Sequence, residues 1–571
     1  MEDRPEVEVR CHPFRIGRLR VTREMILLIA LVLLAFVMRF ALLPADSVIN
    51  GDGIYYTILG ERFVSGDISG GISAYWSPFY SLLTGISSLL FADRAFAGRF
   101  VSLIAGSLLL VPSYLLIRDL YGRRAAIIGS VFLVFDPSLI RASSWVMTES
   151  VYTLVFVGFI LAGWKAFKSG ALAMYFATGI LLGMSFLLKP EAIAYVLLML
   201  IPTVCVAFWT STLQGSGLAI RYLTLVVGFS IFFLPYFLFI HSKTGIWTIS
   251  QKVAINLPAA DFNGELLKIL NGEGKTMKDM IWGDDYGSPN PAPAFSTAAG
   301  DSQADSPGWI AATLVLSKKA KSQLMWQIRR YIPAIMPLAF LFVLIAGFFS
   351  KPWTRGRVSR DGYLLLFFLA TLAGYSFSSV ELRYLFPLIP ILIAWVASGV
   401  VNLSEWARAT AQALRPDSID RLKPIYFQIL ATIVLLLSTT PMYYGYLAAD
   451  TIQNIPFEEK RAGIWLHDHT EIRNPTVMSA NITVAFYANA NHVYLPDEDR
   501  STTIKYARQR NASYLVLSSR RAKEVPSFGL DRNGGMAGLT EVYRDRQDPS
   551  HEITIYKVEC SQPDTNILFR R

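Results

Sequence analysis

The chain has 571 residues, of which 53% are hydrophobic and 17% charged, and its mean hydropathy is +0.39. A soluble protein of this length needs more charge to cover its surface, so this composition excludes a soluble protein with a large core. The net charge of +10 does not indicate nucleic-acid binding, because the basic residues sit mainly in short loops between apolar blocks.

Residues 1–24 are polar and basic, and a first apolar run spans about 25–43. This run is long and no small-residue cleavage site follows it, which favours a retained helix over a signal peptide. Further apolar blocks of about 20 residues, the length that crosses a bilayer, bring the expected number of spans to about eleven. They lie near residues 97–117, 125–141, 147–164, 171–188, 192–209, 222–240, 332–350, 362–379, 385–401 and 425–446.

Two segments between the spans are long. The first, at residues 44–96, contains the apolar stretch 72–92, in which Pro78 and several Gly and Ser residues indicate an interfacial or re-entrant segment rather than another span. The second, at residues 242–330, is rich in Gly, Pro and Ser around 283–308. We expect it to form a flexible outer flap that closes over a site.

Lys and Arg are divided unevenly between alternate loops, and cytosolic loops carry the excess of these residues. The basic amino terminus belongs with one set of loops, which holds Arg118, Arg123, Arg124, Lys165, Lys168, Lys351, Arg355, Arg357, Arg360, Arg408, Arg415, Arg421 and Lys423. We therefore expect a multi-pass protein of the plasma (inner) membrane with a cytosolic amino terminus. An odd number of spans then places the carboxyl end outside.

The last part of the chain has the pattern of a small globular domain. Strand-like runs alternate with helical stretches near 457–468 and 501–510, which predicts an α/β arrangement. The strand-like runs are TVMSA, HVYLP, SYLVLS and EITIYKV. The expected organisation is a cytosolic segment at 1–24, a polytopic α-helical membrane domain at 25–446 and an extracytoplasmic α/β domain at 447–571.

Carboxylates lie near the outer ends of the predicted spans. Asp52, in VINGDGIYYTILGERF, is either an ordinary aspartate of an Asn-Gly-Asp-Gly turn or a carboxylate presented by the helix that follows. Glu149, in SSWVMTESVYTL, either caps the helix that begins there or takes part in catalysis. Asp136, in FDPSL, better fits a turn residue before Pro137 and is kept as a further candidate.

Cations are predicted at the same face of the membrane. Arg99 lies in AFAGRFVSL, Lys189 lies with Glu191 in LLKPEAI, and Arg383 lies in ELRYLFPLIP. Each cation alone would suit an anchor that reaches the lipid headgroups. Several cations beside carboxylates indicate instead a site for an anionic substrate.

The cysteines indicate neither a disulfide framework nor a metal cluster. Cys11, Cys205 and Cys560 fall in segments assigned to the cytosol, the membrane and the exterior, so no two of them can pair within one chain. The spacing of His, Cys and carboxylates forms no metal motif, and no phosphate-binding glycine motif or internal repeat is present.

Several of these segments resemble the GT-C membrane glycosyltransferases. GDGIYYTILGERF, AYWSPFYSLL and AGRFVSLIAGSLLLVPSYLLIRDLYGRRAAIIG are similar to the start of the family 39 branch, with the protein O-mannosyltransferases and the aminoarabinose transferase of lipid A. The later segments WVMTESVYTL, LLKPEA and ELRYLFPLIP fit the same template. The likeness covers most of residues 25–400 and is most specific in the first 150.

The resemblance implies transfer of a sugar from a polyprenyl-phosphate carrier to a lipid, glycan or protein acceptor, with inversion at the anomeric carbon. Asp52 matches the first-loop aspartate taken as the general base, although Gly53 stands where the family usually has a second acidic residue. Glu149 matches a second acidic position in the next outer loop. The basic positions implied for the carrier phosphate are Arg99, Lys189 and Arg383. Further candidates for the site are Tyr55, Asp136, Glu191 and Tyr384. Relatives differ in their use of a divalent metal, so the resemblance leaves that requirement open.

Elementary chemistry agrees with these roles. A hydroxyl is a poor nucleophile until a positioned carboxylate takes its proton, and a departing phosphate is stabilised by cations, of which Arg offers paired donors. The main alternative function is a transporter or flippase for a lipid-linked sugar. Transporters place ionisable residues near the midplane and commonly contain internal repeats, whereas here the charges are predicted on the outer side and no repeat is visible.

Overall fold

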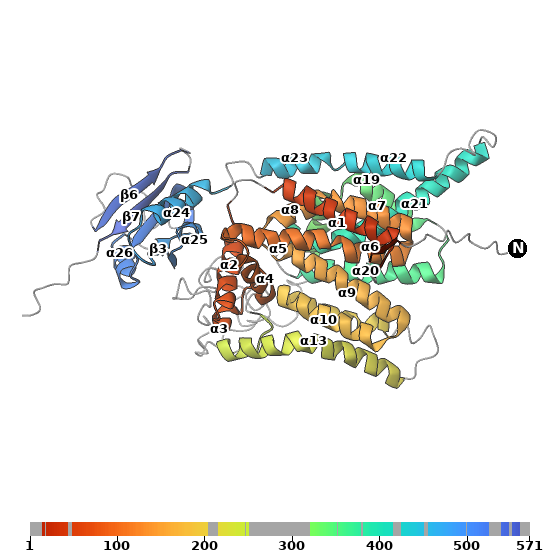
Figure 1. The fold of residues 1–571 in the computed structure, drawn as a ribbon, viewed down its shortest axis with the longest axis horizontal. Helices are drawn as coiled ribbons and strands as arrows, with labels where there is room; N and C mark the ends of the chain where they lie inside the picture. Colours follow the sequence, from red (N-terminus) through yellow and green to blue (C-terminus); the bar gives the residue numbers. More distant parts are fainter. Residues whose placement is uncertain are drawn as a thin grey trace, which may run out of the picture.

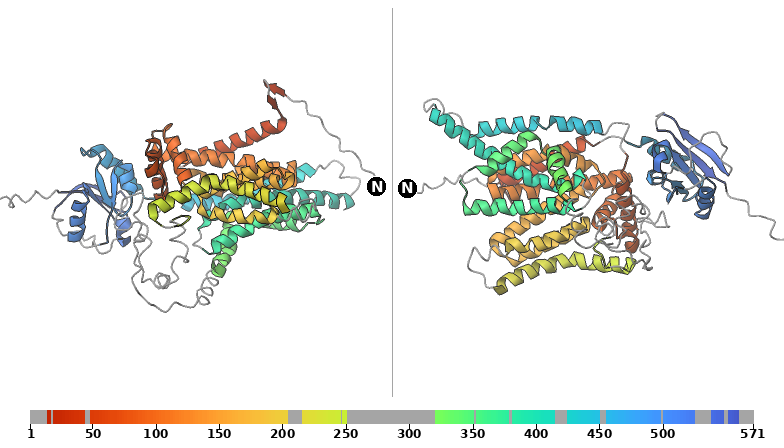
Figure 2. Two further views of the ribbon diagram at one scale, coloured as in Figure 1. Left: turned by 90° about the horizontal axis from the view of Figure 1, so that it is seen from below. Right: turned by 180° about the vertical axis from the view of Figure 1, so that it is seen from behind.

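The computed structural model describes residues 14–16, 19–43, 48–203, 215–245, 247–250, 320–350, 352–377, 381–414, 424–449, 455–497, 500–524, 538–547 and 551–559. An elongated bundle of helices meets a small α/β domain at one end, called here the domain end (Figure 1). The views from below and from behind show the same arrangement (Figure 2). The three cysteines and most of the predicted flap at 242–330 lie outside the described residues.

Helices make up nearly all of the bundle, after a short amino-terminal hairpin of β1 and β2. The bounds of these elements are β1 Phe14–Ile16, β2 Leu19–Val21, α1 Arg23–Ala41, α2 Gly51–Val64, α3 Ile68–Gly71, α4 Pro78–Ser88, α5 Arg94–Leu108, α6 Leu110–Tyr121, α7 Arg123–Val134, α8 Pro137–Ser144, α9 Glu149–Ser169, α10 Leu172–Leu188, η1 Pro190–Ala192, α11 Ile193–Leu198, α13 Gly215–Thr244, η3 Gln327–Tyr331, α18 Ile332–Ile335, α19 Leu338–Phe349, α20 Arg355–Ser376, η4 Leu382–Leu388, α21 Ile389–Leu414, α22 Pro424–Leu437 and α23 Thr440–Ala449.

The bundle is that of a multi-pass membrane protein, but the predicted number of eleven spans is not confirmed. Among the described residues, six helices are long and apolar enough to cross a membrane, and the number rises to eight if each of two bent helix pairs is one span. The segments predicted near 171–188 and 192–209 form shorter apolar helices. The segment predicted near 362–379 belongs to α20, whose first two turns carry Arg355, Arg357, Arg360 and Asp361.

One of the bent pairs shows how the chain accommodates a break within apolar surroundings. Helices α7 and α8 meet at an angle of 52°. The buried Arg39 of α1 donates to the carbonyl oxygens of Leu133 and Val134, at 3.0 and 3.4 Å, and so supplies donors to carbonyl groups at the buried end of α7. Asp136 accepts from the Leu139 amide at 2.9 Å and caps the start of α8. Asp136 thus directly precedes Pro137 at the break between the two helices.

Charged residues separate toward the two ends of the bundle. Arg118 pairs with Glu24 at the start of α1 at 3.1 Å, and Arg124 lies 3.7 Å from Glu405. Glu405 lies on α21, which extends toward the end opposite the domain end (Figure 1). Which end faces the cytosol stays a prediction.

The stretch 72–92 forms no span and packs instead as α4 against α2 at the domain end. Two glycines allow the helices to touch through their backbones: a Cβ placed on Gly85 would lie 2.2 Å from the carbonyl oxygen of Gly60, and one on Gly60 would lie 2.6 Å from the amide nitrogen of Gly85. The packing of α4 therefore fixes the position of α2.

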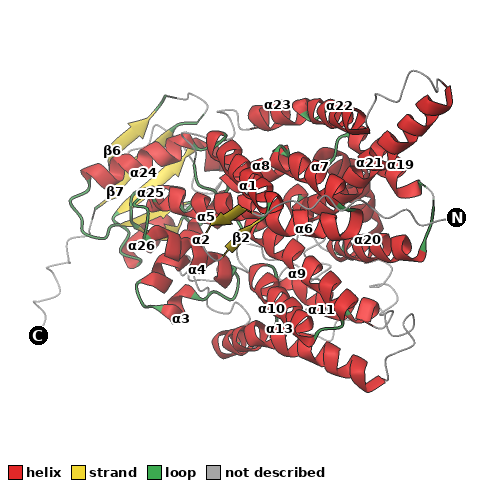
Figure 3. Cartoon of the chain, turned by 45° about the vertical axis from the view of Figure 1, so that its right-hand side comes forward, coloured by secondary structure: helices red, strands yellow, loops and turns green. Residues whose placement is uncertain are grey.

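The carboxyl-terminal domain is the predicted α/β unit (Figure 3). Among its described residues, five strands form one sheet in the order β4-β3-β5-β7-β6. Strands β4, β3 and β5 run parallel to one another, whereas β7 runs antiparallel to both of its neighbours, β5 and β6. The bounds are α24 Phe457–His469, β3 Thr476–Ser479, α25 Thr483–Tyr487, β4 Asn491–Tyr494, α26 Arg500–Gln509, β5 Tyr514–Ser518, η5 Ser519–Glu524, β6 Leu539–Asp545 and β7 Ile553–Val558.

Alternate residues of the strands pack on opposite faces of this sheet, as the two-residue period of a strand requires. Val477 and Val516 contact the cluster formed with α24 and α25, whereas Met478 and Leu515 contact the cluster that includes Ala507 of α26. The sheet is thus covered by helices on both faces.

The glycine contact between α2 and α4 gives a first prediction. Gly85→Ala forces the two helices apart, so we expect the free energy of unfolding to fall by about 1–3 kcal/mol. Gly362→Ala is the matched control, because no atom lies within 4 Å of the added methyl group; alanine there should leave stability unchanged or raise it by up to about 1 kcal/mol. Thermal unfolding of the purified variants measures both. Equal unfolding temperatures for the two variants would contradict the close packing.

Candidate active site

Asp52 is the second residue of α2, at the domain end. The Asn50 side chain caps the helix by accepting from the Gly53 amide at 2.9 Å. A Cβ on Gly53 would lie 2.8 Å from both the Cβ and the carbonyl oxygen of Val146. The glycine that replaces a second acidic residue therefore lets α2 pack directly on the segment that leads into Glu149.

Glu149 lies between two cations. It is the first residue of α9 and its side chain is 2% exposed. One carboxylate oxygen lies 3.5 Å from Lys189 Nζ and 3.8 Å from Arg383 Nε. Arg383 also reaches Asp52 at 3.6 Å, and the Asp52 side chain is 31% exposed. These four residues form one charged network, which brings together segments remote in the sequence.

The ammonium group of Lys189 is further held by aromatic faces. It lies 4.7 Å from the ring centre of Tyr384 and 5.2 Å from that of Tyr152. Lys189 follows the last residue of α10, and Pro190 prevents that helix from continuing regularly. The break turns the Lys-Pro-Glu segment toward the network.

The charged network borders a cavity of about 340 Å³, within the size range of small-molecule sites. Asp52, Glu149, Lys189 and Arg383 all line it, as do the predicted candidates Glu191 and Tyr384. Glu191 accepts from the hydroxyl of Tyr375 at 2.6 Å. The cavity therefore combines a partly exposed carboxylate, two cations and a wall of hydroxyl groups.

Three other candidates do not line this cavity. Arg99 lies on α5 and is absent from the cavity lining. The same helix is joined to the segment before α9 by a hydrogen bond of 3.3 Å from the Ser102 hydroxyl to the Met147 carbonyl oxygen. Tyr55 faces the carboxyl-terminal domain, and burial, then the neighbouring Tyr494, raises the pKa of its hydroxyl well above the ordinary value. Asp136 caps α8. Their predicted roles stay predictions.

Apart from the predicted Tyr384, the tyrosines of the cavity wall were not predicted. Tyr56, Tyr75, Tyr195, Tyr236 and Tyr375 line the cavity. Burial, then the nearby Asp52 carboxylate, raises the pKa of Tyr75 to about 12, so this phenol stays neutral and can donate a hydrogen bond at ordinary pH. The sequence gives one signal for these residues, their position near helix ends, but tyrosine is common at both membrane interfaces.

The carboxylates of the site are paired with cations. Asp52 and Glu149 are each paired with Arg383, and Glu149 also with Lys189. In the described part of the chain, no three His, Cys, Asp or Glu side chains come together as metal ligands. The requirement for a divalent metal that the resemblance left open stays untested.

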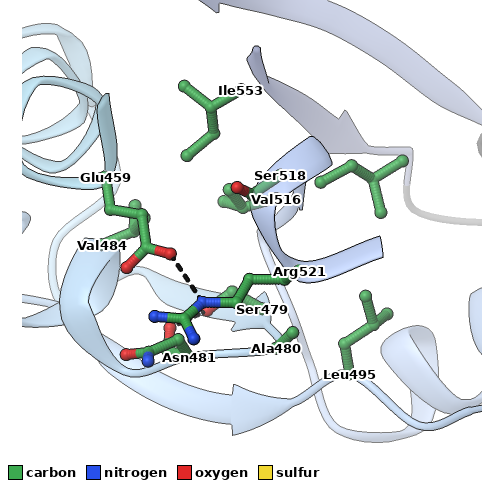
Figure 4. A pocket seen from close by; sticks show the side chains of 11 residues that line it. Glu459, Ser479, Ala480, Asn481, Val484, Leu495, Val516, Ser518, Arg521 and Ile553 are labelled. Atoms are coloured by element: carbon green, nitrogen blue, oxygen red, sulfur yellow. Dashed lines mark hydrogen bonds and ion pairs between the residues drawn. The ribbon is translucent and has the colours of Figure 1, made fainter. Parts of the chain in front are cut away.

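A second cavity lies in the carboxyl-terminal domain, where β3 and β5 end (Figure 4). Arg521 reaches into it and pairs with Glu459 at 3.0 Å. Its volume is about 10 Å³, room for about one water molecule. A sugar does not fit there, so the cavity lined by the charged network is the candidate active site.

Part of the sequence matches a known family. Residues 76–238 match the family described as dolichyl-phosphate-mannose-protein mannosyltransferase. The matched segment contains Glu149, Lys189 and Glu191, whereas Asp52 and Arg383 lie outside it. No curated protein sequence matches the chain significantly.

Solved structures share the fold over most of the chain. ArnT from Cupriavidus metallidurans in the apo state is 14% identical with a TM-score of 0.57, over 94% of this chain and 98% of that one. ArnT bound to undecaprenyl phosphate is 15% identical with a TM-score of 0.56, over 92% and 97%. The apo Archaeoglobus fulgidus oligosaccharyltransferase is 14% identical with a TM-score of 0.56, over 87% and 70%. The chain therefore has the GT-C fold, and the predicted resemblance is confirmed.

The network predicts how the site responds to loss of its shared carboxylate. Glu149→Leu leaves Lys189 without that partner in buried surroundings, so we expect the free energy of unfolding to fall by about 3 kcal/mol. The double variant Glu149→Leu/Lys189→Met removes the orphaned charge and should recover part of the loss. Thermal unfolding measures both variants.

The control for this prediction is Glu381→Leu, which removes a carboxylate that is 57% exposed and lies 2.7 Å from Arg383. An exposed pair of this kind contributes under about 1 kcal/mol. The interpretation is wrong if Glu149→Leu unfolds no more easily than Glu381→Leu.

Proposed function

We propose that the protein is an inverting glycosyltransferase that moves a sugar from a polyprenyl-phosphate carrier to a lipid, glycan or protein acceptor at the outer face of the membrane. The observation that carries the proposal is the cavity in which Asp52 lies beside Arg383 and Lys189. The GT-C fold supports it, because proteins of this fold include ArnT bound to undecaprenyl phosphate and an oligosaccharyltransferase in complex with an inhibitory peptide and dolichol-phosphate.

Arg383 and Lys189 bind the carrier phosphate. The donor phosphate is a diester with one negative charge, as a carboxylate has, and its two free oxygens match the paired donors of a guanidinium, so it competes with Asp52 and Glu149 for Arg383. Glu149, buried between the two cations, holds them in place. Engagement of Arg383 by phosphate loosens its pair with Asp52 and frees that carboxylate to accept a proton.

Asp52 acts as the general base. It takes the proton from the acceptor's nucleophilic group as the acceptor atom forms a bond to the anomeric carbon. The bond from that carbon to the phosphate oxygen breaks, and its electron pair leaves with the phosphate. The two cations stabilise the charge that develops there. A single displacement inverts the anomeric centre, and Asp52 returns its proton to water.

Glu191 and the tyrosine hydroxyls contact the sugar. Glu191 already accepts from Tyr375, and the hydroxyls of Tyr195 and Thr371 lie 2.7 Å apart in the same wall. Such groups offer hydrogen bonds to sugar hydroxyls and an aromatic face to the ring. The sugar is a hexose or a pentose.

The positions of the charges favour an enzyme over a transporter of lipid-linked sugars. Asp52 and Glu149 lie in the first turns of their helices, and Lys189 directly follows the last residue of α10. Transporters place such charges at broken helices near the midplane. With the amino terminus in the cytosol, the domain end faces the outside of the plasma membrane, where a carrier keeps its tail in lipid and its headgroup in the cavity.

The role of Asp52 gives the next prediction. Asp52→Asn should lower the turnover of sugar transfer at least about 100-fold, because the acceptor loses its base. The KM for the donor should not rise, since the cations that bind phosphate remain and Arg383 is released from its pair with Asp52. The assay uses purified protein and a panel of labelled polyprenyl-phosphate hexoses and pentoses.

The matched control is Asp67→Asn. Asp67 is an exposed aspartate of the same loop that caps α3 by accepting from the Gly70 amide at 2.9 Å. It should retain wild-type transfer. Unchanged transfer in Asp52→Asn would remove Asp52 from its proposed role.

A further inference from the structure

The helix that carries Asp52 is held by the carboxyl-terminal domain. The backbone amide of Ile49 donates to the hydroxyl oxygen of Tyr487 at 3.1 Å, and the hydroxyls of Tyr55 and Tyr494 lie 2.8 Å apart. Ile49 lies three residues before Asp52 and Tyr55 three residues after it. The two bonds therefore hold the chain on both sides of the carboxylate, within one helical turn.

A second link holds the far end of the same helix. Glu61 accepts two hydrogen bonds from the Arg94 guanidinium, at 2.6 and 2.7 Å. Arg94 donates in turn to the Phe486 carbonyl oxygen at 3.2 Å and lies 4.4 Å from the centre of the Phe486 ring. The segment around α25 thus contacts the chain at the start of α2 directly, and it contacts the end of α2 through Arg94.

The contact surface is buried. Tyr55 is 6% exposed, Tyr494 is 7% exposed, and both belong to the same apolar cluster as Ile49 and Phe486. The Tyr55 ring also stacks on Trp76, with 4.8 Å between the ring centres. A hydrogen bond in such surroundings is directional and costly to leave unmade, so the orientation of the domain and that of α2 are coupled.

We propose that the carboxyl-terminal domain positions the general base, with Tyr487 and Tyr494 as the positioning residues. Neither tyrosine lines the cavity. They act through α2, whose first turn sets the direction in which Asp52 faces the cavity, and a displacement of about 1 Å at a reacting group can cost about 100-fold in rate. The catalytic part of this inference rests on the proposed function, whereas the hold on α2 does not.

Hydrogen exchange of the full chain in detergent tests the hold on α2 without any substrate. Tyr494→Phe and Tyr487→Phe each remove one hydroxyl from the contact. We expect amides of residues 51–57 to exchange about fivefold faster in each variant, as one lost hydrogen bond predicts. Tyr514→Phe is the matched control, because its hydroxyl bonds to Thr470 at 3.0 Å within the carboxyl-terminal domain. If the amides of residues 51–57 exchange at the same rate in Tyr494→Phe, Tyr487→Phe and the control Tyr514→Phe, the proposal is overturned.

Transfer kinetics with the panel of labelled polyprenyl-phosphate sugars test the effect on the base. We expect the turnover of Tyr494→Phe to fall about fivefold with the donor KM unchanged, while Tyr514→Phe keeps both values. Faster exchange of α2 with normal turnover would overturn the positioning role. A wild-type protein that transfers no sugar from any donor would refute the proposed function, and the exchange data would still decide whether the domain holds α2.

Discussion

The site depends on the pairing of charges that lie together at the domain end. Arg383 lies between Asp52 and Glu149, and Glu149 also holds Lys189. Glu149 and Lys189 are buried, and a buried charge without a partner would destabilise the fold by several kcal/mol, so these two residues require the network. Its four members come from four segments distant in the sequence. The network therefore fixes how these segments meet. It also places paired cations at the cavity, where an entering anion can replace a carboxylate as the partner of a cation.

Much of the fold could be predicted because the bilayer and the strand period impose simple patterns. Apolar blocks predicted the helices, and strand-like runs predicted four of the five described strands of the carboxyl-terminal sheet. The strand β6 was missed because LTEVYRD is an edge strand, half exposed and rich in polar residues. The number of spans was not confirmed, because the helices at Leu172–Leu188 and Pro190–Thr203 are short and because the first two turns of α20 are charged.

The site could be predicted in part. Asp52, Glu149, Lys189 and Arg383 stood out as ionisable residues beside apolar helices, and the structure brings them together. Whether a residue near a helix end faces the cavity depends on the rotation of that helix, which the sequence does not encode locally. For that reason Arg99 was grouped with the other cations although it does not line the cavity, and among the tyrosines of the wall Tyr384 alone was predicted. The contact between α2 and the carboxyl-terminal domain joins residues more than 400 positions apart and left no local signal.

The central claim is that Arg383 and Lys189 receive a carrier phosphate in the cavity beside Asp52. A structure of the full chain with undecaprenyl phosphate in a lipid nanodisc tests it most directly. The account predicts phosphate oxygens within about 4 Å of the Arg383 guanidinium and the Lys189 ammonium group, with Asp52 facing the same space. A phosphate bound outside the cavity, with Arg383 still paired to Asp52 and Glu149, would contradict it.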